Sequence, residues 1–306
     1  MPSKPASFFP FVRSWVKKFM LPQLQWALLA EVGLIAVWAM WVGRAYLDFD
    51  PFAWPMGMEM GAQLQTHHLW TRLQSCGLCA LWDGSINGGY PALADIFGSM
   101  LPPLVAITTL IWGVMTGAKM SLVAALWMAG LAQWWIAKSL GLGRAARIWS
   151  ALLAVVGGHL AGRMENSNFG LVLSTAACSL ALAAALELGL TGKRRAALLL
   201  ALTGAWAIVS GQGYLQLALL GWSPAFLFLV LDRHLRARSV WREYVLAIGL
   251  ALLLAGVFLA PTWHFGLQIY KDTDLSFPAA QPFEYIPLNL VIRDTSFMRA
   301  PVLGKL

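Results

Sequence analysis

Charged residues are scarce in this sequence. They account for 12% of the 306 residues, whereas 59% are hydrophobic. Because soluble globular domains carry about 25% charged residues, this scarcity excludes an ordinary soluble domain. The apolar residues also form long blocks, so the sequence predicts an integral membrane protein.

Cysteine is also rare, and the chain's three cysteines exclude a disulfide framework. Cys76 and Cys79 have zinc-like spacing, but a structural zinc ion needs four ligands. Only His67 and His68 are near, and there is no second CxxC. We therefore expect a local disulfide, or two thiols without a metal. Cys178 falls in an apolar block, where we expect ordinary packing.

Two further features are missing. No A-x-A cleavage pattern follows the first apolar block, which is long for a signal peptide, so we interpret it as an uncleaved span. No internal repeat is visible, although inverted repeats are typical of secondary transporters. A lipid or solute transporter is thus an alternative that rests mainly on Glu31, an acid within the first span. Such an acid is a functional candidate, or is hydrogen-bonded to a neighbouring helix.

Seven apolar blocks are long enough, or nearly so, to cross a bilayer. They cover residues 26–42, 119–137, 145–161, 169–190, 196–212, 214–231 and 243–262. The fold class that we expect is all-α: a polytopic membrane protein with about seven transmembrane helices.

Charge indicates the orientation. The net charge of +8 could suit nucleic acid, but excess Lys and Arg also retain loops in the cytoplasm. We expect no nucleic-acid partner. The N-terminus and the joints 138–147, 193–195 and 233–242 together hold fourteen of the 22 Lys and Arg residues, while the other side holds ten of the fourteen acids. The sequence therefore predicts a cytoplasmic N-terminus, with the polar loops facing outward.

This orientation requires residues 47 and 118 to lie on the same side. The apolar segment 96–115 is too short to cross twice, so we expect an interfacial or re-entrant helix there; a plain second span is the alternative. The chain would be one membrane domain, residues 1–306. It would comprise a cytoplasmic segment 1–24, an outer loop 44–118, a helix bundle 119–262 and an outer segment 263–306, which we expect to continue in a longer chain.

Candidate chemistry lies in the outer loops. Asp48, Asp50 and Glu59 follow the first span, where a carboxylate could act as a general base or bind a hard cation, or simply be solvated. His67 and His68 point about 100° apart if helical, so only one can face a given site.

Further along, "LWDGSINGGYP" places Trp82 and Tyr90 in a glycine-rich turn that allows close approach of a ligand or simply a tight return. In "GGHLAGRMENSN", His159, Arg163 and Glu165 cluster at the end of a span. Arg163 could grip a phosphate, or form a surface pair with Glu165.

Taken together, these motifs resemble a known family. An outer acid, a histidine about ten residues on, "LWDG…GGYP" and a membrane-bound helix resemble the bacterial YfhO-type multi-pass proteins, which are placed among the GT-C-fold glycosyltransferases. "GHLAGRMENSNFGLVLSTAA" and "SGQGYLQLAL" are similar to two further family motifs. In place of the family's Gly-Asp pair the chain has Met58 and Glu59, with Asp50 upstream.

The resemblance implies inverting transfer of a sugar from a polyprenyl-phosphate donor to an acceptor, at the outer face of a bacterial inner membrane. It implies Glu59 or Asp50 as the catalytic base, and we prefer Glu59 because it lies closer to His68 and more closely resembles the family position. It implies that His68 is an auxiliary site residue and that Arg163 binds the lipid phosphate. Together with the candidates from the loops, the expected substrate-binding residues are His68, His159, Arg163, Glu165, Trp82 and Tyr90. The expected cofactor, if any, is a divalent cation such as Mg²⁺ or Mn²⁺; the expected partners are the bilayer, the lipid donor and an acceptor. A non-catalytic membrane subunit is the other alternative.

Overall fold

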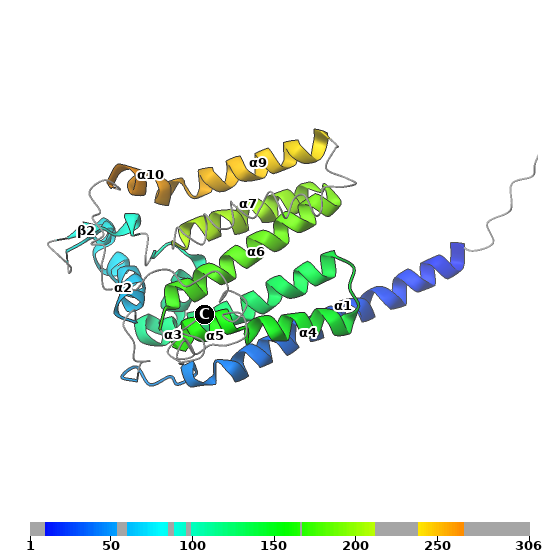
Figure 1. Ribbon diagram of the computed structural model, residues 1–306, viewed down its shortest axis with the longest axis horizontal. Helices are drawn as coiled ribbons and strands as arrows, with labels where there is room; N and C mark the ends of the chain where they lie inside the picture. Colours follow the sequence, from blue (N-terminus) through cyan, green and yellow to red (C-terminus); the bar gives the residue numbers. More distant parts are fainter. Residues whose placement is uncertain are drawn as a thin grey trace, which may run out of the picture.

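The computed structural model describes residues 10–53, 60–84, 89–95, 99–165, 167–211 and 238–265. The described part is mostly helical, as predicted (Figure 1). Its α-helices are α1 (Pro10–Val42), α2 (Met60–Cys76), α3 (Pro103–Ser139), α4 (Arg144–Val155), α5 (Gly158–Glu165), α6 (Phe169–Thr191), α7 (Arg194–Val209), α9 (Arg238–Leu254) and α10 (Gly256–Phe265). Short 3-10 helices are η1 (Arg44–Tyr46), η2 (Gly77–Leu81) and η3 (Ala92–Ala94), and β1 (Trp82–Asp83) pairs antiparallel with β2 (Tyr90–Pro91).

Three stretches of the described chain are long and apolar enough to cross a membrane: α3, the α4–α5 stretch Arg144–Glu165, and α6. The pair formed by Val240–Leu254 and α10, bent by 64°, brings the number to four if it counts as one span. The apolar part of α1, Trp26–Val42, is shorter. The helical membrane class is therefore supported, while seven spans stay a prediction; the block 214–231 lies outside the described residues.

The segment 96–115, where we predicted an interfacial or re-entrant helix, contains a break in α3 at Gly113. This residue has φ 75° and ψ −171°, so α3 consists of two helical pieces that meet at a sharp bend. A Cβ at Gly117 would lie 2.8 Å from the carbonyl oxygen of Thr108, so residues 103–112 fold back onto the longer piece. The helix resumes directly after Gly113, before residue 119 where we predicted the start of this span, and the start of the span itself stays a prediction.

The two ends of the bundle differ in character (Figure 1). The α3–α4 joint, the α6–α7 joint and the start of α9 lie at one end, and α2, β2 and α10 lie at the other. The basic joints 138–147 and 193–195 thus share one end with Arg242 of α9. We call this the basic end and the other the loop end. This grouping is the one expected from charge.

Small residues bring the central helices together. A Cβ on Gly130 of α3 would lie 2.7 Å from the Cγ2 atom of Ile35 on α1 and 2.8 Å from that of Val155 on α4. All three helices therefore meet at this glycine. The surrounding core continues through buried residues of α3 and α6, such as Leu122 and Phe169.

Glu31 belongs to this helix packing. Its carboxylate is 5% exposed and accepts hydrogen bonds from Trp134 Nε1 at 2.7 Å and Arg147 Nη2 at 2.9 Å. The neighbouring indole of Trp135 donates to Glu187 of α6. Adjacent tryptophans of α3 thus bind acids on two different helices. We predicted that Glu31 is either a functional acid or hydrogen-bonded to a neighbouring helix, and the hydrogen bonds to neighbouring helices are confirmed.

Candidate functional site

The loop that follows α1 presents two carboxylates. Asp48 Oδ1 accepts the backbone N–H of Asp50 at 2.9 Å, and Asp50 Oδ1 accepts that of Phe52 at 2.9 Å. Side chains of Asp favour such turns because they bond to the backbone two residues on. Both aspartates remain exposed, so Asp50 is held in a defined turn at the loop end with its carboxylate open to solvent.

A buried lysine attaches this turn to the bundle. Lys119 of α3 is 1% exposed, and its Nζ donates to the backbone carbonyls of Asp50 and Ala53, both at 2.9 Å. Burial of an ammonium without partners is strongly unfavourable, and the two carbonyl dipoles offset that cost. Lys119 was not among the site residues that we predicted from the sequence. The available signal was that it is the single charged residue between Leu101 and Ala137.

An aromatic contact joins the same loop to the motif "GHLAGRMENSNFGLVLSTAA". The ring of Tyr46 meets the ring of Phe169 edge-on, with centroids 5.9 Å apart. Phe169 begins α6, directly after the turn in which the backbone N–H of Asn168 donates to the carbonyl of Arg163 at 2.8 Å. The segment around Asp50 and the segment around Arg163 therefore lie at the same end, as predicted.

The α5 residues are arranged along a short helix. Arg163 is half-buried, and Glu165 is exposed. His159 is exposed as well, and its Nε2 lies 3.4 Å from Thr175 Oγ1 of α6. The helix α5 therefore lies beside the start of α6, near the loop end.

In α2 the structure separates the two histidines. His68 is exposed, whereas His67 is fully buried. His67 Nδ1 lies 2.6 Å from Thr109 Oγ1, and His67 Nε2 lies 3.3 Å from Gln63 Nε2. Because an amide nitrogen only donates, Nε2 accepts and the proton is on Nδ1. Thr109 then accepts from the histidine and donates to the carbonyl of Val105 at 2.7 Å.

His67 therefore joins α2 to the folded-back piece of α3. Burial lowers its pKa to about 3, so the ring is neutral at physiological pH. We favoured His68 for function on the basis of the resemblance. The side chain that contacts the bundle is His67, and His68 is available to solvent or to a ligand.

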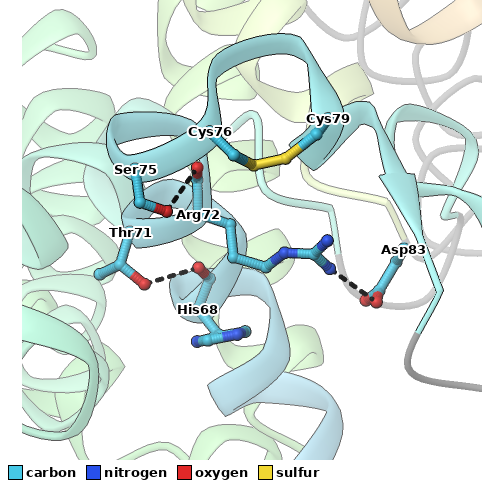
Figure 2. The surroundings of a disulfide bond; sticks show 7 residues. All are labelled: His68, Thr71, Arg72, Ser75, Cys76, Cys79 and Asp83. Atoms are coloured by element: carbon cyan, nitrogen blue, oxygen red, sulfur yellow. Dashed lines mark hydrogen bonds and ion pairs between the residues drawn. A yellow bond between two sulfur atoms is a disulfide. The ribbon is translucent and has the colours of Figure 1, made fainter.

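The segment after α2 is stabilised by an ion pair and a disulfide (Figure 2). Cys76 and Cys79 form the predicted local disulfide. Arg72 Nη1 lies 3.3 Å from Oδ1 of Asp83, which is 1% exposed, and the amide of Gln65 donates to Oδ2 of the same carboxylate. Asp83 thus has a structural role in this loop, because its two bonds to α2 hold the start of the hairpin in place.

The predicted turn residues lie on this hairpin. Trp82 is 52% exposed and pairs with Pro91 across the two strands, while Asp83 pairs with Tyr90. Trp82 is therefore available at the surface for a ligand. Glu59, our preferred catalytic acid, lies outside the described residues.

No group of three or more His, Cys, Asp or Glu residues in the described part of the chain could hold a metal ion. A magnesium ion often takes only one or two protein carboxylates and completes its shell with substrate phosphates and water. Exposed Asp50 suits such a shared ion. Comparison with known protein families, with characterised proteins and with solved structures finds no match to this chain.

Proposed function

We propose that this chain is a membrane protein of about seven spans that transfers a sugar from a polyprenyl-phosphate donor to an acceptor at the outer face of a bacterial inner membrane. The loop end would face outward and the basic end would face the cytoplasm, in keeping with the positive-inside rule. The carbonyl of Gly211 accepts a hydrogen bond from Ser174 near the start of α6, at the loop end, and α9 begins at the basic end. The block 214–231 therefore remains our predicted further span.

The observation that carries the proposal is the placement of Asp50. Its carboxylate is exposed, yet its backbone carbonyl is bound by buried Lys119 at 2.9 Å, so the turn is anchored to the bundle. A general base needs an accessible carboxylate on a well-positioned backbone. The Tyr46–Phe169 contact brings Arg163 to the same end, where a guanidinium can bind the donor phosphate bidentately.

In the proposed reaction, the carboxylate of Asp50 accepts the proton of the acceptor hydroxyl as that oxygen attacks the sugar. The sugar–phosphate bond breaks, and the polyprenyl phosphate leaves with its negative charge stabilised by Arg163. Glu59, which we preferred from the sequence, lies outside the described residues and stays the other candidate for the base. His68, His159, Glu165, Trp82 and Tyr90 are the proposed substrate contacts, and a Mg²⁺ or Mn²⁺ ion would add charge stabilisation at the phosphate.

The test is transfer of radiolabelled sugar from polyprenyl-phosphate donors in membranes that contain the protein. Asp50→Asn keeps an oxygen to accept the Phe52 N–H and removes only the basic charge. We expect a loss of about 10²- to 10⁴-fold. Asp48→Asn is the matched control, since it makes the same change in the preceding turn, and it should retain transfer.

Two results would reject the proposal. One is the absence of transfer by the wild-type protein with every donor offered. The other is transfer at the wild-type level by each of two single variants, Asp50→Asn and Glu59→Gln, because neither proposed base would then be needed.

A further inference from the structure

A cleft of about 460 Å³ lies between α7 and α9. Arg194 and Arg242 place it toward the basic end of the bundle, opposite the candidate site. It is lined by Arg194, Ala197 and Leu198 of α7 and by Arg242, Glu243, Leu246, Ala247 and Leu250 of α9.

The floor of the cleft is apolar and closely packed. Ala197 and Ala247 are 6% and 2% exposed, because small side chains let the two helices approach each other. The hydroxyl of Tyr244 donates to the carbonyl of Ala185 on α6 at 2.6 Å, which fixes α9 against the bundle. Leu198 and Leu246 are 56% and 58% exposed and form an apolar rim. The lower part of the cleft therefore matches a hydrocarbon chain.

The mouth of the cleft is positively charged. The buried carboxylate of Glu243 lies 3.2 Å from Arg242 Nη2 and 3.9 Å from Arg194 Nε. The two arginine side chains are 64% and 84% exposed, so most of their N–H groups face outward. One carboxylate between two guanidinium groups leaves a net positive charge. Lys193 and Arg195, both exposed, increase it.

We propose that this cleft binds an anionic phospholipid, with its phosphate on Arg194 and Arg242 and an acyl chain against Leu198, Leu246 and Leu250. Guanidinium groups match phosphate oxygens in geometry and charge. Basic pockets between transmembrane helices at the cytoplasmic side suit such headgroups. The apolar rim selects a lipid over a soluble phosphate, which would make no use of it.

The inference rests on the membrane topology in the proposed function, and does not depend on sugar transfer. Purified full-length protein would be incubated with mixed vesicles of phosphatidylglycerol and phosphatidylcholine, extracted, and analysed by native mass spectrometry for bound lipid. We expect the wild-type protein to retain phosphatidylglycerol preferentially. Arg194→Gln with Arg242→Gln should reduce that preference by about fivefold for each arginine removed.

The matched control is Lys193→Gln with Arg195→Gln. It removes the same charge from the same end of the bundle, but neither residue lines the cleft. It should keep most of the preference. Glu243→Gln should act in the opposite direction and raise retention, because it frees both guanidinium groups. Circular dichroism would show whether each variant is folded. If the double variant Arg194→Gln with Arg242→Gln is not folded, Arg242→Gln alone would be tested in its place.

Three results would overturn the inference. Equal losses in the two double variants would indicate diffuse attraction to the basic surface. Displacement of the lipid by millimolar inorganic phosphate would indicate a soluble ligand. An unchanged preference in Arg194→Gln with Arg242→Gln would exclude the cleft. Sugar transfer should persist in that double variant, so a failure of either proposal can be told from a failure of the other.

Discussion

Arg147 and Glu31 are paired across 116 positions of sequence, with Arg147 Nη2 2.9 Å from Glu31 Oε1. The pair joins α4 to α1 near the basic end. Arg144, one turn earlier on α4, approaches the same oxygen only to 3.8 Å through its Nε. The Arg147 side chain is 16% exposed and the Arg144 side chain is 62% exposed, so one carboxylate has a buried partner and a solvated one.

This difference predicts unequal effects of two otherwise equivalent substitutions. Arg147→Gln leaves the buried carboxylate of Glu31 without its close cation and should destabilise the protein by about 3 kcal/mol. Arg144→Gln should cost less than about 1 kcal/mol, because exposed pairs contribute little. Thermal unfolding in detergent, followed by circular dichroism, would measure both. Similar shifts in the two variants would contradict the assignment.

The burial of His67 predicts loss of stability in mild acid. Its pKa falls from about 6.5 in the unfolded chain to about 3 in the folded protein, so the unfolded chain binds the extra proton between these values. The contribution of the neutral His67 ring to the free energy of unfolding is complete above about pH 6.5 and is lost as the pH falls toward 3. Lowering the pH from 7 to 5 should cost about 2 kcal/mol from this group.

Two variants isolate the contribution of His67. His67→Asn keeps an N–H donor for Thr109 and cannot be protonated, so its unfolding midpoint should change less between pH 7 and 5 than that of the wild-type protein. His68→Asn, which changes the exposed neighbour, should retain the wild-type pH dependence. An identical pH dependence in the wild-type protein and His67→Asn would show that other groups control acid stability.

The disulfide predicts a thiol count. The chain has three cysteines, and Cys178 is the buried free one. Titration of the denatured protein should therefore find one thiol before reduction and three after it. Because the bridge closes a very short loop, Cys76→Ser with Cys79→Ser should lower stability by only about 2 kcal/mol. Three thiols before reduction, with stoichiometric zinc lost in that variant, would show a metal site instead.

The contact between Lys119 and the Asp50 loop predicts a local change in dynamics. Lys119→Met keeps the length of the side chain but removes both bonds to the carbonyls of Asp50 and Ala53. Backbone amides of residues 48–53 should exchange faster with deuterium, as measured by mass spectrometry. The matched control is Lys138→Met, a lysine of the same helix whose ammonium lies over the ring of Trp134. Unchanged exchange in Lys119→Met would mean that the loop is held by other contacts.

The two ends of the bundle predict opposite labelling. In a variant without native cysteines, single cysteines at positions 50 and 193 would be exposed to a membrane-impermeant maleimide in intact cells. We expect labelling at position 50 and none at position 193 until the membrane is permeabilised. Labelling of both positions from the same side would contradict the proposed topology.

The apolar helices of the described chain were predictable because apolar blocks and basic joints have a direct physical meaning in a membrane. The polar helix α2 was not, and it lies within the segment that we predicted as an outer loop. A helix that does not cross the membrane was predictable near Gly113. Residues 47 and 118 must lie on the same side, and the segment 96–115 between them is too short to cross twice. The form of that helix was not predictable, because the fold-back depends on the backbone of Thr108 meeting Gly117, a contact with no side-chain signature.

The site was less predictable. Composition cannot tell which of His67 and His68 faces inward, because that depends on Thr109, which is 42 positions away. Lys119 bonds to backbone carbonyls, which every residue offers, so no motif marks its partners. Asp83 was expected as part of a turn, and its pairing with Arg72 reflects how the disulfide loop returns toward α2.

In the proposed seven-span topology, the lengths of two neighbouring helices have a consequence for the bilayer. At 1.5 Å per residue, the 23 residues of α6 extend about 35 Å and the 16 residues of α7 about 24 Å. A hydrocarbon core is about 30 Å thick. Leu198 and Leu202 of α7 are 56% and 59% exposed, so this shorter helix faces outward. If α7 spans the membrane as we propose, the lipids beside it would have to thin, and this hydrophobic mismatch would favour short acyl chains next to α7 and residence in thinner membranes.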